Sequence, residues 1–184
     1  TVDLGDLAAA RVLKAISAAA YFSRPNVYPI VVFRIARLAL SKGLCAESAA
    51  GFLGLGVVHA ALLGDYARAE QLGKIAQAIE ARFQAHHLSG YLAMVYHAFI
   101  HHWNHPLKES LESLGLGADA ALASGDTEFW SYCWYWQGAH AIYTGQNLSE
   151  LRHRIQAQCS SIERRQQKKG RLLLHLHHAV DTLI

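Results

Sequence analysis

The sequence predicts an all-α fold, a right-handed α-solenoid of tandem antiparallel helix hairpins with a period of about 40 residues. Three observations predict it. Apolar residues recur at helical spacing, no comparable run of alternating β-branched residues occurs, and the breaks between helical segments fall at regular intervals. The predicted organisation is one helical-repeat domain over residues 1–184, as a fragment of a longer chain.

Helical periodicity is clearest in three apolar stripes, each stepping by three or four residues so that its members share one helix face. The stripes are Leu72, Ile75, Ala76, Ile79 and Phe83; Leu107, Leu111, Leu114, Ala118 and Leu122; and Leu148, Leu151, Ile155, Cys159 and Ile162. Ala and Leu, both strong helix formers, dominate the chain.

Breaks in this pattern form two interleaved sets. The first set, spaced by 40, 40 and 41 residues, is Arg24-Pro25, Gly64-Asp65, Asn104-His105 and Gly145-Gln146. The second, spaced by 43, 39 and 45 residues, is Gly43, His86, Gly125 and Gly170. Two turns in each period predict a helix hairpin as the repeating unit.

The breaks delimit eight helices, taken in order as 4–22, 29–42, 47–63, 66–84, 88–103, 107–124, 127–144 and 148–183. The last is interrupted near Lys168–Gly170 and could be two helices.

Local signals support the starts of these helices. Asp65 and Asp126 follow glycines and can accept hydrogen bonds from the first free amides of the next helix. Asn147 has a glutamate three residues later, the spacing of a capping box. Pro29 and Pro106 suit first-turn positions, where a missing N–H does no harm.

Composition excludes several classes of protein. With 52% apolar and 17% charged residues, the chain has the apolar surface that a folded core needs. The sequence has no uninterrupted apolar stretch of about 18 residues, so it predicts no membrane span. The three cysteines, Cys45, Cys133 and Cys159, lie far apart without a C-x-x-C, which is typical of buried thiols in a cytoplasmic protein.

The net charge of +3 is modest, although seven of the seventeen Lys and Arg residues lie between Arg152 and Arg171. This stretch has no Phe, Tyr or Trp for stacking on bases, so we interpret it as a solvated helix end and loop and expect no nucleic-acid partner.

Residues Gly51–Ala81 resemble a tetratricopeptide repeat. Gly64-Asp65-Tyr66 falls on the turn between its two helices, and Ala69 and Ala76 fall on its small second-helix positions. The other units depart from that pattern, because the period is near 40 residues and Glu109 and Glu150 replace the second-helix alanine.

A wider resemblance covers nearly the whole chain. The segments SAAAYFSRPNVYPIVVFRIARLALSKG, SAAGFLGLGVVHAALLGDYARAEQLGKIA and HAFIHHWNHPLKESLESL look like the helical-repeat region of large multidomain signalling proteins. In such proteins a serine/threonine-kinase-like domain and an AAA-type ATPase domain precede the repeats, and a GAF domain and sensor histidine kinase often follow. The resemblance implies a regulatory or scaffolding role. The chain has no G-x-x-x-x-G-K-[ST], kinase H-R-D or D-F-G, so we expect it to be non-catalytic and to need no cofactor.

The tetratricopeptide register implies a concave groove that binds a partner segment or a flanking domain. It places Gly51, Gly54, Val58, Ala61 and Leu62 there from the first repeat; Tyr91, Met94, Ala98, His101 and His102 from the second; and Tyr132, Tyr135, Ala139, Ile142 and Tyr143 from the third. The alternative is that these residues pack within the superhelix. Exposed repeat ends could also support a homodimer.

The chain has twelve histidines, which raises the hypothesis that some of them bind a metal ion. His97, His101 and His105 are four residues apart, but a turn is predicted at Asn104–Pro106, so only His97 and His101 are expected to share a helix. This pair is the metal candidate, but it has no glutamate in an H-E-x-x-H arrangement and no nearby cysteine, so we expect no metal. His86, His87, His175, His177 and His178 are expected in loops or at the surface.

Two further hypotheses remain open. A small ligand could bind against Tyr91, His101, Tyr132 and Tyr135, which would make the array a sensor. The dense aromatic run from Trp130 to Trp136 is either buried on both sides by neighbouring helices or half exposed as an interface.

Overall fold

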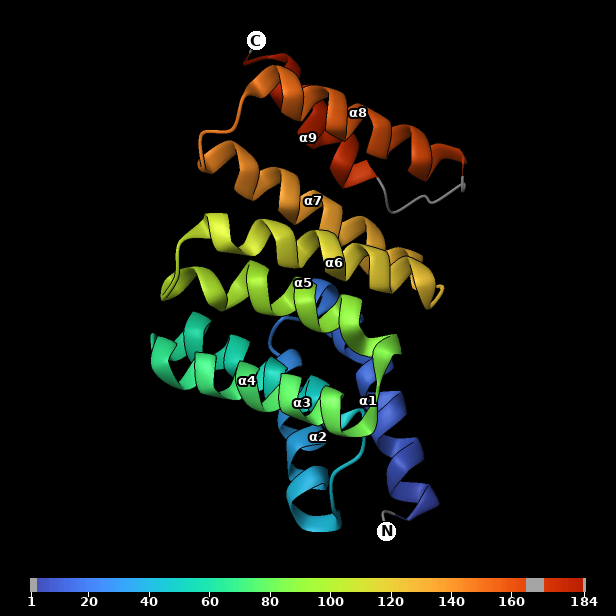
Figure 1. Ribbon diagram of the computed structural model, residues 1–184. Helices are drawn as coiled ribbons and strands as arrows, with labels where there is room; N and C mark the ends of the chain where they lie inside the picture. The colour runs from blue at the N-terminus through green and yellow to red at the C-terminus, as the bar shows by residue number, and fades with distance from the viewer. Residues whose placement is uncertain (1–2, 165–170, 184) are drawn as a thin grey trace. The chain divides into compact units, whose positions relative to one another are not determined.

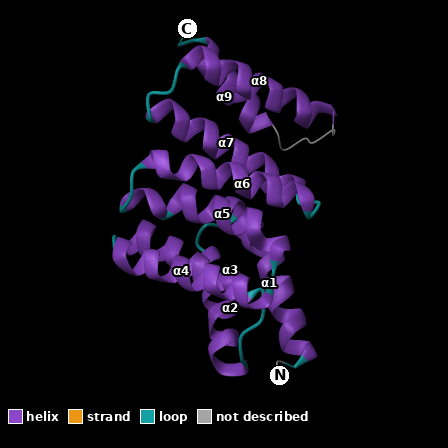
Figure 2. Cartoon of the chain, in the orientation of Figure 1, coloured by secondary structure: helices purple, strands orange, loops and turns teal. Residues whose placement is uncertain are grey.

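The computed structural model describes residues 3–164 and 171–183, most of which lie in helices. No strand occurs among these residues, which form α-helices joined by short loops (Figure 2). This confirms the predicted all-α class. Within the same residues, no helix combines the length and apolarity needed to cross a membrane.

The contacts divide the chain into two compact units, Thr1–His86 and His87–Ile184. The helices of the first unit are α1 (Leu4–Ser23), α2 (Tyr28–Lys42), α3 (Ser48–Val58) and α4 (Tyr66–Phe83). Those of the second are α5 (Ser89–Phe99), α6 (Ser110–Ala123), α7 (Thr127–Tyr143), α8 (Leu148–Arg164) and α9 (Arg171–Asp181) (Figure 1).

The predicted turns lie between these helices. Gly64, Gly125 and Gly145 have left-handed φ angles of 64°, 79° and 71°, which glycine adopts without the steric cost of a Cβ. The next helices begin as predicted: Asp65 and Asp126 each accept a 3.0 Å hydrogen bond from the backbone N–H three residues later. The predicted interruption at 168–170, the turn at Gly170 and part of the basic stretch lie outside the described residues.

Three predicted helices are subdivided. The 47–63 helix is α3 followed by one π-helical turn, His59–Leu63. The 88–103 helix is α5 followed by a 3₁₀ turn, His101–Trp103, and the 107–124 helix begins with a 3₁₀ turn, Leu107–Glu109. Short 3₁₀ turns are common at the ends of α-helices.

In the first unit, each helix packs on the next one in the chain. The α2–α3 contact is close because α3 presents glycines to α2: a Cβ at Gly51 would lie 2.8 Å from the Ala36 nitrogen, and one at Gly54 would collide with Val32. These two glycines therefore contact α2 rather than line a groove. On α4, Ala69 and Ala76 are buried at the small positions that the sequence predicted.

In the second unit, α7 is the central helix and packs against α5, α6, α8 and α9. Trp130 is fully buried, and Tyr132, Trp134, Tyr135 and Trp136 are half-buried. The aromatic run is thus largely covered by neighbouring helices, as one of the two sequence interpretations expected. Small residues again allow close packing, since a Cβ at Gly117 of α6 would lie 2.5 Å from the Cβ of Ala93 on α5.

Candidate functional site

A cluster of histidines in the second unit holds its most unusual chemistry. We define the histidine cluster as His97, His101, His102, His105 and His140. Four of its members come from the end of α5 and the following turn, and His140 comes from the last part of α7.

The backbone after α5 determines where these rings lie. α5 ends at Phe99, and Ile100 leaves the helical conformation with φ −123° and ψ −56°. His101 therefore lies beyond the helix, and the expectation that His97 and His101 share one α-helix is wrong. The 3₁₀ turn and the extended Pro106 then return the chain toward α6 within a few residues.

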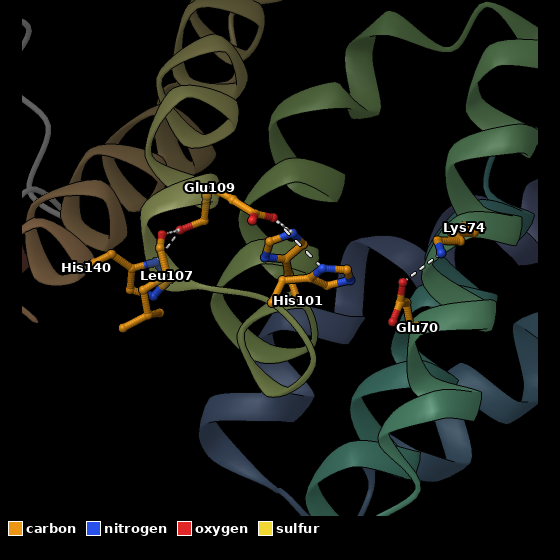
Figure 3. A network of polar contacts seen from close by, with 8 residues as sticks. Glu70, Lys74, His101, Leu107, Glu109 and His140 are labelled. Carbon is orange, nitrogen blue, oxygen red and sulfur yellow. Dashed lines mark hydrogen bonds and ion pairs between the residues drawn. The ribbon is translucent and has the colours of Figure 1, made fainter. Parts of the chain in front are cut away.

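This compact turn brings three imidazoles and one carboxylate together. The rings of His97 and His101 have centroids 4.7 Å apart, and those of His101 and His105 stack at 4.4 Å with an interplanar angle of 20°. The Oε2 atom of Glu109 lies 3.9 Å from Nε2 of His101 and 3.9 Å from Nδ1 of His105. Figure 3 shows the Glu109 carboxylate directed at the His101 ring.

A second contact joins the N-terminus of α6 to α7. The Oγ atom of Ser110 lies 2.6 Å from the Leu107 carbonyl oxygen and 2.6 Å from Nδ1 of His140, whose ring appears beside Leu107 in Figure 3. A hydroxyl has one proton, and the carbonyl can only accept, so Ser110 donates to Leu107 and His140 Nδ1–H donates to Ser110. Because Ser110 is fully buried, this pair is a structural link and not an exposed nucleophile with its base.

Burial keeps part of the histidine cluster neutral. Burial lowers the pKa of His97 to about 4, with further lowering by the nearby His101, His140 and His105. Burial likewise lowers the pKa of His140 to about 4, with contributions from His102 and His101. The pKa of His102 is also lowered by burial. Neutral imidazoles have a free lone pair, which is the form that binds metal ions.

The residues expected to line a groove lie in different environments. Tyr91, Met94 and His101 are buried, whereas His102, Tyr132 and Tyr135 are half-buried. Tyr91 and Tyr132 both pack edge-on against Phe129, at centroid distances of 5.0 and 5.8 Å. Tyr143 is 78% exposed and lies eleven residues further along α7 from Tyr132, about 16 Å along the helix axis. The structure therefore gathers Tyr91 and Tyr132 at Phe129, whereas Tyr135 packs against Trp136 and Tyr143 lies apart.

The remaining histidines and the cysteines follow the sequence predictions in part. His86 and His87 are exposed in a short 3₁₀ turn. His175, His177 and His178 lie on helix α9 rather than in a loop; His175 and His178 are exposed and His177 is half-buried. All three cysteines are free and buried, as predicted. Burial raises the pKa of the Cys133 thiol to about 12, so this thiol is protonated at neutral pH.

Sequence reasoning missed Glu109 and Ser110. His105 and Glu109 are four residues apart, a spacing that places two side chains on the same face of a helix. The turn predicted at Asn104–Pro106 separates them, so a shared helix face is not expected from the sequence. The Ser110–His140 contact joins residues thirty positions apart, and no local pattern indicates it.

Comparison of the chain with protein-family models, with curated protein sequences and with solved structures gives no match.

Proposed function

We propose that this chain is a non-catalytic protein-interaction module, a right-handed tetratricopeptide-like solenoid that regulates or scaffolds a larger cytoplasmic signalling protein. Hairpin packing supports the architecture. α3 and α4 form an antiparallel pair around the Gly64–Asp65 turn, and in the second unit α7 packs on both α5 and α6. Contact between a hairpin and the first helix of the next one is how repeat arrays bury their apolar faces.

One observation carries the interaction function: an apolar face of α2 is exposed. We call it the α2 face and define it as Ile30, Phe33, Arg37 and Leu40. Ile30 is 68% exposed, Phe33 60% and Leu40 78%. Residues three, seven and ten positions after Ile30 share one side of a helix, so these side chains form one stripe. Contiguous exposed apolar surface of this kind is typical of protein-binding sites.

Charge on the α2 face indicates the chemistry of the partner. Arg37 lies within the stripe, and Arg34 lies beside it; both are exposed. A partner that combines an apolar ridge with acidic residues complements this face best. A helix from a protein partner or from a flanking domain of the same protein has this chemistry when one side is apolar and its edges carry Glu or Asp.

The environments of Ser110, Cys133 and Cys159 favour a non-catalytic role for the chain. Ser110 is fully buried and donates its proton to a backbone carbonyl, and burial keeps the Cys133 thiol protonated. Burial also raises the pKa of the Cys159 thiol, to about 11. None of these three groups has the exposed, activated state that covalent catalysis needs.

The test compares proteins that co-purify with the wild-type chain and with a double variant, Phe33→Ser with Leu40→Ser. Both side chains are exposed, so the variant should keep its helical circular dichroism. Leu116→Ser on α6, which replaces another exposed leucine, is the matched control. We expect a specific partner to be retained by the wild type and the control and depleted at least tenfold from the double variant. An identical set of proteins on all three chains would contradict the proposal.

A further inference from the structure

A nine-residue segment, His101–Glu109, places three metal-ligating groups next to one another. Each of His101, His105 and Glu109 offers one ligand atom, and these three atoms lie within 4.8 Å of one another. Oε2 of Glu109 lies 3.9 Å from Nε2 of His101 and 3.9 Å from Nδ1 of His105. We propose that His101, His105 and Glu109 bind a divalent transition-metal ion such as Zn²⁺. This site goes beyond the interaction function proposed above and does not depend on it.

The spacing of the three atoms suits a small cation. Two of the three separations are 3.9 Å, and the third is at most 4.8 Å. A point equidistant from all three atoms therefore lies about 2.5 Å or less from each, and shifts of about 0.4 Å bring them to the ~2.1 Å of Zn–N and Zn–O bonds. Changes in side-chain torsions alone can supply shifts of this size, without movement of the backbone.

Glu109 has no role in capping its own helix. It occupies the position just before α6, and its side chain makes no cap hydrogen bond. Its carboxylate is directed at the imidazoles of His101 and His105 instead, and Figure 3 shows this for His101. Two nitrogens and one carboxylate are a ligand set that zinc sites use, with a fourth position left for water.

The exposure of the three ligand side chains increases from His101 to His105 to Glu109, so a metal ion can reach the site from solvent. The His101 side chain is 10% exposed, that of His105 35% and that of Glu109 57%. His101 would provide the fixed inner ligand, held by the packing of its ring against Tyr96, and Glu109 would complete the site from the solvent side. His97, the other metal candidate from the sequence, is not part of this set of ligands.

The nature of the donors favours zinc over harder cations. Imidazole nitrogen suits Zn²⁺, Cu²⁺, Ni²⁺ and Fe²⁺, whereas Mg²⁺ and Ca²⁺ prefer all-oxygen sites. Co²⁺ takes the same ligands as Zn²⁺ and absorbs visible light when bound, which makes it the spectroscopic probe.

The experiment titrates ZnCl₂ into the full chain, purified without a histidine tag, by calorimetry, and repeats the titration with CoCl₂ by absorbance. The test variants are Glu109→Gln and His105→Gln, both of which replace partly exposed side chains. The matched controls are Glu112→Gln, another acidic residue near the start of α6, and His87→Gln, an exposed histidine outside the segment.

We expect one Zn²⁺ per chain at this site and a visible Co²⁺ spectrum. Each test variant should weaken Zn²⁺ binding at least tenfold, because even the loss of a group that only orients a ligand costs about 10–100-fold. The controls should bind as the wild type does. Trp103 lies inside the segment, so bound Co²⁺ should also quench tryptophan fluorescence, and Trp103→Phe should reduce that quenching. Wild-type affinity in the Glu109→Gln and His105→Gln variants, or no Zn²⁺ binding by the wild type at millimolar concentration, would overturn the proposal.

Discussion

Stability of the second unit should depend on pH through His140. This histidine is 4% exposed, and burial with the neighbouring His102 and His101 lowers its pKa from 6.5 to about 4. Between these two values the unfolded chain binds a proton at His140 and the folded chain does not. Acidification therefore favours the unfolded state, and the stability present above pH 6.5 is lost as the pH falls toward 4.

The size of this loss of stability follows from the coupling between proton binding at His140 and folding. For one group whose pKa falls from 6.5 to about 4, acidification from about pH 7.5 to about pH 4.5 lowers the free energy of unfolding by about 2.5 kcal/mol. The variant His140→Gln keeps a side chain that can bond Ser110 but has no titratable group, so its stability should fall by that much less over the same range. In urea the difference corresponds to a midpoint shift of about 1–2 M.

The assay is urea unfolding followed by tryptophan fluorescence. All four tryptophans, Trp103, Trp130, Trp134 and Trp136, lie in the second unit, so the signal reports that unit alone. Ser110→Ala is the control, because it removes the hydrogen bond to His140 and leaves the imidazole in place. This control should be less stable at every pH and should keep the part of the pH dependence that His140→Gln loses, whereas the part due to His97 remains in both variants. Parallel pH profiles for wild type and His140→Gln would refute the reasoning.

The remaining predictions concern packing, capping and the thiols. Gly117→Ala places a methyl group 2.5 Å from the Ala93 side chain, so it should destabilise the second unit by about 1–2 kcal/mol in the same urea assay. Gly115→Ala meets only the end of the Gln137 side chain, which can move at the cost of its hydrogen bond to Leu111, so it should destabilise less. Asp126→Ala removes the cap of α7 and should cost about 1 kcal/mol, whereas Asp126→Asn should retain most of the stability; equal losses would contradict a capping role. Cys45, Cys133 and Cys159 are buried, so a thiol reagent such as DTNB should react with them only as fast as the protein opens; rapid labelling of the native chain would contradict their burial.

Local chemistry explains why so much of the fold could be predicted. A glycine with a left-handed φ, such as Gly64 or Gly125, ends a helix, and the aspartate that follows begins the next one, whatever the rest of the chain does. Helix starts and ends therefore depend on a few adjacent residues. Burial of Ala69 and Ala76 was also predictable, because small residues at helical spacing allow two helices to approach.

The candidate site was less predictable, because it depends on where a helix stops being regular. His101 and His105 would lie on an α5 that continued through them, but the chain leaves the helix at Ile100 and then passes through two 3₁₀ turns. That path is what brings Glu109 to both rings. The environment of His140 depends on α6 packing against α7, and no pattern in the sequence of α7 alone reports it.

The central claim, that the chain works by binding through the α2 face, is tested most directly by a photo-crosslinking phenylalanine analogue placed at position 33. The analogue is installed in the full-length protein in its own cells and compared with the same analogue at position 116, an exposed site on α6. We expect position 33 to crosslink to one protein partner or to one other segment of the same protein, and we expect Leu40→Ser to abolish the crosslink. Crosslinks that are absent at position 33, or equal at positions 33 and 116, would contradict it.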